Sequence, residues 1–117
     1  MTLMSDEDRK TALREHPAVA EVLAQFGDGA DAVLDELAAG LNAEQIQAIP
    51  QSPAMPPDAS AVDGFRCWRA GAVYAVYQLF GMAVCTIVGG YTGGLAAIAC
   101  RMIKAAAGKA IDWNSLC

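Results

Sequence analysis

The chain has 117 residues, of which 55% are hydrophobic, and its formal net charge is −5. This length allows one small domain, and so high an apolar content with 11 glycines is unusual for an ordinary soluble core. A surface that meets a membrane or a partner is therefore expected, whereas a nucleic-acid partner is not.

Charge is divided unevenly along the chain. Residues 1–64, the acidic half, carry twelve acidic and three basic side chains, a net charge of −9. Residues 65–117, the basic half, carry five basic side chains and one acidic side chain, a net charge of +4. The change of sign indicates two separable parts, and the basic half could attract anionic lipid. The opening residues MTLMSDEDRK lack the basic run and apolar stretch of a secretion signal, so general secretion is not expected.

Residues 1–49 are expected to form an acidic leader of short amphipathic helices. Ser5 and Asp8 resemble a capping box that begins the first helix, and Pro17 suits the first turn of the next. An apolar period typical of a helix continues from Pro17 and returns over residues 30–41. These local signals predict helices that each bury one face.

The acidic half ends in a proline-rich segment. Asn42 and Gln45 form a second capping-box pattern, which begins a short helix that Pro50 ends. Residues 50–64, with the sequence PQSPAMPPDASAVDG, hold four of the five prolines. Because proline blocks helix formation, this segment is predicted to be an extended linker of the kind that proteases cut.

The basic half contains a long uncharged run. Between Arg69 and Arg101 lie 31 residues without a charged side chain, enough to span a bilayer. Glycines in the middle of the run predict a turn between two helices, over roughly residues 67–88 and 95–111. The turn residues are Gly89, Gly90, Tyr91, Thr92, Gly93 and Gly94. The predicted fold class is thus all-α, with leader helices, a linker and a C-terminal helical hairpin over residues 65–117.

The four cysteines are placed symmetrically about this turn. Cys85 and Cys100 flank it closely, Cys67 and Cys117 flank it at a distance, and both pairs centre near Thr92. Three pairings are open to four cysteines, and the hairpin favours nested disulfides. The outer one would close a long loop worth about 4 kcal/mol in the chain-entropy account. The alternative is four reduced, buried cysteines in a cytoplasmic membrane hairpin.

Basic and aromatic side chains flank the apolar run, where membrane-contacting groups are expected. Arg101, Lys104 and Lys109 fall within an arc of about 140° on a helix, as a cationic helix lying on lipid requires. A merely solvated face would give the same pattern. The predicted membrane-contacting residues are Arg66, Trp68, Arg69, Arg101, Lys104 and Lys109.

The sequence lacks patterns for catalysis or metal binding. His16 is the sole histidine and has no cysteine nearby, so neither a zinc site nor a nucleophilic triad can be assembled. The cysteines lack C-x-x-C spacing, and GDGADA at residues 27–32 follows a helical pattern rather than the strand that a phosphate-binding loop needs. No catalytic residue, metal or cofactor is expected, and the chain is predicted not to be an enzyme.

An acidic helical leader, a linker and a glycine-rich, cysteine-bracketed cationic segment together resemble precursors of ribosomally synthesised bacteriocins. The stretch CTIVGGYTGGLAAIAC, from Cys85 to Cys100, is similar to the cysteine-rich and glycine-rich repeats of halocins. The nested hairpin is similar to that of glycocins. Halocins have more cysteines than the four here, and glycocins are shorter with closer cysteine spacing.

The resemblance implies how such a chain would be processed. A leader-processing peptidase and an exporter would act on a cytoplasmic precursor, cleavage would fall between Gly64 and Phe65, and the product would be secreted. The glycocin likeness also implies a modifying enzyme, with Thr92 or Ser115 as sugar acceptor.

Three functions are compatible with these features. The leading hypothesis is a precursor of a secreted antimicrobial peptide whose basic half perturbs target-cell membranes after the leader is removed. The first alternative is a resident small protein of the cell membrane, such as an immunity protein or a holin. The second is a soluble helical interaction module in which the acidic helices pack on the hairpin within one domain.

Overall fold

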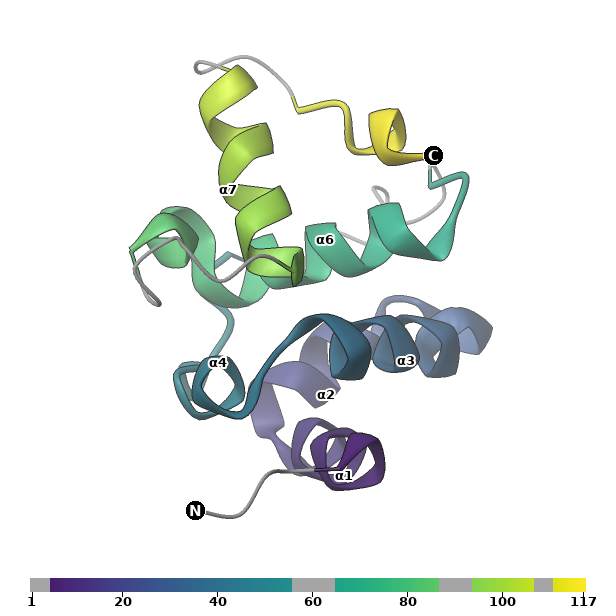
Figure 1. Cartoon of the computed structure of the whole chain (residues 1–117). Helices are drawn as coiled ribbons and strands as arrows, with labels where there is room; N and C mark the ends of the chain where they lie inside the picture. The colour runs from purple at the N-terminus through teal and green to yellow at the C-terminus, as the bar shows by residue number, and fades with distance from the viewer. Residues whose placement is uncertain (1–4, 56–64, 87–93, 107–110) are drawn as a thin grey trace.

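The structure, a computed structural model, describes residues 5–55, 65–86, 94–106 and 111–117. The described residues form helices and no strand, so the predicted all-α fold class is confirmed. Figure 1 shows the helices stacked in layers, with α6 (Trp68–Phe80) crossing the middle of the molecule.

The acidic half folds into short helices whose boundaries follow the predicted caps. Both predicted capping boxes form, at Ser5 with Asp8 and at Asn42 with Gln45, and each satisfies backbone donors that the first helical turn leaves unpaired. Pro17 begins a new helix after a short break at His16. The elements are α1 (Asp6–Glu15), α2 (Pro17–Ala24), the 3₁₀ turn η1 (Gly27–Gly29), α3 (Ala30–Gly40) and α4 (Ala43–Gln47).

Two of the three basic side chains in the acidic half fasten α1 to α3. The Nζ of Lys10 lies 2.8 Å from the carboxylate of Asp35, and this hydrogen bond raises the pKa of Lys10. Arg9 pairs with Asp6 on its own helix, and its Nε donates to the carbonyl of Ala38 at 2.8 Å. These bonds place α1 on the side of α3 that faces away from α6 (Figure 1).

The first helix of the basic half is shorter than predicted. The first was expected to reach residue 88, but α6 ends at Phe80 because Gly81 adopts a φ of +62°, and a 3₁₀ turn, η2 (Gly81–Cys85), follows. Of the predicted turn, only Gly94 is described, and it begins the second helix with a φ of +73°. The other turn residues lie outside the described residues. The remaining elements are α7 (Gly94–Ala106) and η3 (Trp113–Leu116).

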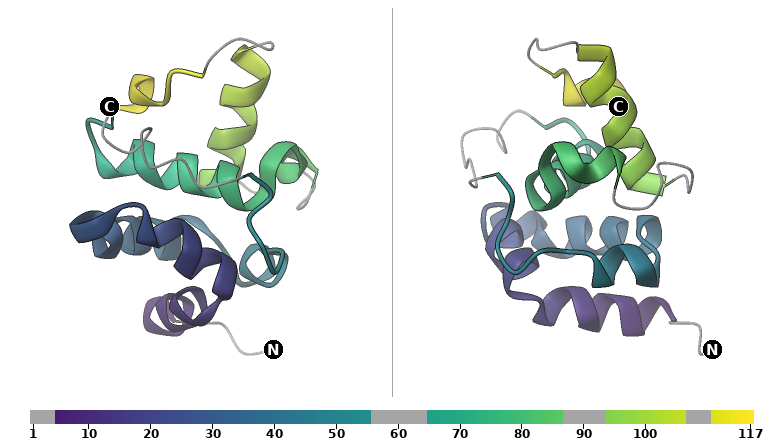
Figure 2. Two further views of the ribbon diagram at one scale, coloured as in Figure 1. Left: turned by 180° about the vertical axis from the view of Figure 1, so that it is seen from behind. Right: turned by 90° about the vertical axis from the view of Figure 1, so that its left-hand side faces the viewer.

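One hydrophobic core connects the two halves. Figures 1 and 2 show α2 and α3 on one side of α6, and α7 crossing its other side. Buried side chains come from every described α-helix, from Leu13 on α1 to Ile103 on α7, and they form a single cluster. The acidic half therefore packs directly on the basic half.

None of the helices among the described residues combines the length and the apolar character that a bilayer span needs.

Candidate functional site: the interface between the halves

The cysteines pair as predicted, and both bonds lie within the basic half. Cys67, just before α6, bonds Cys117 at the end of η3, with their Cα atoms 6.0 Å apart. Cys85, at the end of η2, bonds Cys100 in α7, with a Cα separation of 5.0 Å. No cysteine precedes Cys67 in the sequence, so no disulfide can join the two halves. The acidic half is therefore held on α6 by non-covalent packing, and its only covalent connection to the basic half is the polypeptide backbone.

The centre of this packing is the apolar body of α6. Nearly every residue from Ala70 to Phe80 is buried, and only Tyr74 and Tyr77 are partly exposed. Gly71 allows close approach of the acidic half, because a Cβ there would lie 3.1 Å from the ring of Phe26. The Phe26 ring in turn stacks on Phe65, with 6.4 Å between ring centroids.

A buried amide pair marks the same interface. Gln78 on α6 is fully buried, and it exchanges side-chain hydrogen bonds with Gln25 at the end of α2. Its Nε2 also lies 3.4 Å from the hydroxyl of Tyr74. An unpaired buried amide is costly, so this pair favours one fixed alignment of α6 on α2. The sequence alone does not predict this pair, although Gln78 stands out as an amide within the uncharged run.

Two residues of the proline-rich segment, Ala54 and Met55, cap the C-terminal end of α6. The backbone N–H of Met55 donates to the carbonyl of Gln78 at 3.0 Å, and that of Ala54 donates to Leu79 at 3.3 Å. The last carbonyls of a helix have no partner within it, so these bonds satisfy groups that would otherwise need water. Residues 56–64, which include the proposed cleavage residue Gly64, lie outside the described residues. Phe65, which follows Gly64 across the peptide bond predicted to be cleaved, is half-buried.

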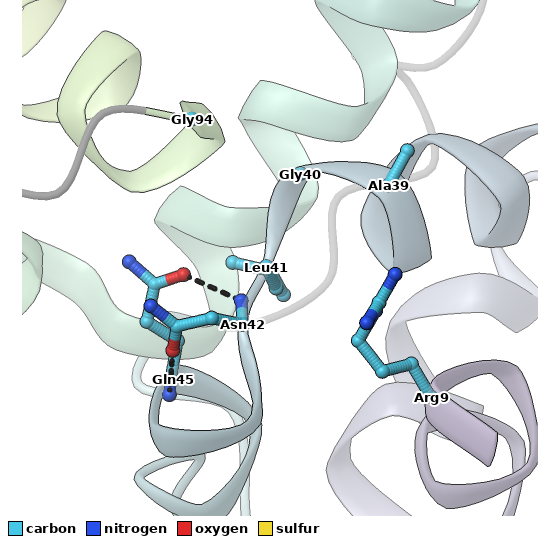
Figure 3. Close-up of a pocket in the computed structure, with 7 residues that line it drawn as sticks. All are labelled: Arg9, Ala39, Gly40, Leu41, Asn42, Gln45 and Gly94. Atoms are coloured by element: carbon cyan, nitrogen blue, oxygen red, sulfur yellow. Dashed lines mark hydrogen bonds between the residues drawn. The ribbon is translucent and has the colours of Figure 1, made fainter. Parts of the chain in front are cut away.

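Two glycines allow the backbones of the two halves to approach closely. The carbonyl of Gly40, at the end of α3, would lie 2.5 Å from a Cβ on Gly94 at the start of α7. Figure 3 shows Gly94 and Arg9 on opposite sides of a hollow of about 290 Å³ beside this contact. Its polar groups already have partners: Asn42 and Gln45 cap α4, and Arg9 bonds the Ala38 carbonyl. The hollow is thus a by-product of close packing.

The predicted membrane-contacting residues divide between two places. Arg69 and Arg101 come together at a groove of about 550 Å³ between α6, α7 and η3. Trp68 is 49% exposed, but its ring lies against Gly29 of the acidic half. Arg66 and Lys104 are exposed, and Lys109 lies outside the described residues.

The described residues hold no group of three or more His, Cys, Asp or Glu side chains that could bind a metal ion. His16 has a structural role: its Nδ1 accepts the backbone N–H of Ala18 at 3.2 Å and so caps α2. Its Nε2 lies 3.2 Å from the carbonyl of Ile49. His16 thus connects the start of α2 to Ile49, which lies just after α4.

No protein-family model, curated protein or solved structure matches this chain. The site is defined by its own geometry: a basic half with two internal disulfides, whose central helix is covered by the helices of an acidic half.

Proposed function

We propose that the chain is the precursor of a secreted, bacteriocin-like antimicrobial peptide, and that its acidic half covers α6 until the linker is cleaved. The observation that carries the proposal is the division of bonds around α6. One side of the helix packs against α7 and η3, which the disulfides hold. The other side packs against α2 and α3, which no disulfide holds.

Release would change the surface of the basic half in two ways. The side of α6 that α2 and α3 cover would be exposed, and large exposed apolar patches are typical of membrane-binding surfaces. The net charge of the molecule would change from −5 to +4, because the acidic half takes its −9 with it. Each basic side chain near an anionic bilayer contributes about 1 kcal/mol of attraction. Both changes favour binding to the membrane of a target cell.

Cleavage of the linker in the full chain tests this function. A recognition sequence for a site-specific protease is inserted within residues 56–64, and dye leakage from phosphatidylglycerol vesicles is measured before and after cutting. We expect roughly tenfold faster leakage after cutting at sub-micromolar concentration, because the linker no longer holds the halves at an effective concentration of about a millimolar.

The control is the same insertion with its residues scrambled, so that the protease cannot cut. It should leave leakage at the level of the uncut chain. Equal leakage before and after cutting, with the fragments separated, would contradict the proposal.

A second candidate is the helical interaction module, and the shared core favours it. In that case the linker is a loop of one domain. The cut chain would then remain associated on size-exclusion chromatography and would cause no leakage at any concentration.

A further inference from the structure

Among the described residues, those that line the groove between α6, α7 and η3 all belong to the basic half. Its floor and walls are largely apolar, with Ile98, Met102 and Leu116 among the lining side chains. Arg69, at the start of α6, and Arg101, in α7, are exposed side chains that also line it. Within the described part of the chain, neither guanidinium forms an ion pair closer than 4.0 Å. The groove therefore combines two cationic groups with an apolar surface.

The acidic side chains that the structure describes near the groove do not line it. Asp112, the one acid of the basic half, lines a neighbouring hollow with Met102 and Ser115. Glu36 of the acidic half lines another hollow, on the α3 side of Arg69. An anion in the groove would therefore meet the two guanidinium groups first.

The outer disulfide fixes one wall of the groove. Cys117 follows Leu116 directly, and its bond to Cys67 ties η3 to the start of α6. The backbone N–H of Arg66 donates to Oδ1 of Asn114 at 2.9 Å. Trp113 packs between Tyr74 and Tyr77, with 5.5 Å between ring centroids in each pair. The wall is thus held in place by a disulfide, a hydrogen bond and ring contacts within the basic half.

We infer that this groove is a docking site for an anionic phospholipid. Arginine side chains bind phosphate oxygens through paired hydrogen bonds, and two guanidinium groups face one space here. Free phosphate has no apolar group that could contact the apolar lining, whereas a phospholipid presents its glycerol and acyl carbons beside the phosphate. The inference rests on the proposed function, which makes a membrane the target.

The location of the groove predicts which comes first, lipid binding or cleavage of the linker. The helices α2 and α3 cover α6 from the other side, and none of their residues lines the groove. At physiological salt the screening length is about 8 Å, so the charge of the acidic half weakens attraction at the groove only locally. The intact precursor therefore binds anionic lipid before cleavage, and cleavage then exposes α6 next to the bilayer.

Binding of the full-length, oxidised protein to vesicles tests the inference. Phosphatidylglycerol and phosphatidylcholine vesicles are compared in about 0.15 M salt, with Arg101→Gln against Lys104→Gln. Both variants remove one positive charge from an exposed position on α7, but Lys104 does not line the groove. We expect Arg101→Gln to weaken binding to phosphatidylglycerol more than tenfold, because a charge-assisted hydrogen bond is lost. Lys104→Gln should weaken it by about fivefold or less, the effect of one surface charge.

Three results would overturn the inference: equal losses in the two variants, equal binding to both lipids, or displacement from the vesicles by millimolar inorganic phosphate. The outcome is separable from that of the proposed function. A cut chain that causes leakage while Arg101→Gln behaves like Lys104→Gln contradicts the groove alone. A groove that binds lipid in a chain inert after cutting contradicts the precursor function alone.

Discussion

Removal of the outer disulfide by Cys67→Ala with Cys117→Ala is expected to lower the free energy of unfolding by about 4 kcal/mol. The bond joins residues separated by 50 positions, so it removes much conformational freedom from the unfolded chain. Removal of the inner bond, which spans 15 positions, is expected to cost about 3 kcal/mol. Small domains are stable by only about 5–15 kcal/mol in total. Either loss should therefore be plain in urea unfolding of the oxidised variants.

The comparison between the two double variants is its own control, because each replaces two cysteines by alanine. Cys100 is buried, so its truncation adds a small packing cost to the inner variant. Unfolding free energies equal to that of the unaltered protein would contradict the account, since the disulfides would then contribute nothing to the fold.

Replacement of Gly94 by alanine is expected to cost about 2–5 kcal/mol, the sum of a left-handed backbone penalty and an overpacked contact. Gly94 has a φ of +73°, and its new Cβ would lie 2.5 Å from the Gly40 carbonyl oxygen. Backbone cannot move aside as a flexible side chain can, so α3 and the start of α7 must separate. Chemical denaturation measures the cost.

Gly27→Ala is the matched control for this variant. Gly27 has a φ of +54°, but a Cβ there meets no atom within 4 Å. It should therefore cost only the backbone penalty, about 1–2 kcal/mol. The difference between the two variants reports the contact between the halves. Equal costs would mean that Gly40 and Gly94 do not meet in solution.

The elements of the acidic half could be predicted because their signals are local. Capping boxes at Ser5 and Asn42, and a proline at position 17, fix where helices begin, whatever they pack against. The cysteine pairing could be predicted for a different reason: the spacing is symmetric about one glycine-rich segment. Both disulfides of the structure follow that symmetry.

The surroundings of α6 could not be predicted in the same way. A helix that is apolar on all sides suits a lipid environment and a protein core equally well, so its sequence does not say which surrounds it. The decisive contacts join residues far apart in the chain. Gln78 meets Gln25 at a separation of 53 positions, and the Gly40 contact with Gly94 is equally remote.

Mass spectrometry of the intact protein, secreted by cells that make it naturally, tests the central claim most directly. The account predicts a fragment that begins near Phe65 and gains about four mass units on reduction, two for each disulfide. Recovery of only the full-length chain, retained in the cell membrane with four reduced cysteines, would contradict the precursor function and favour a resident membrane protein.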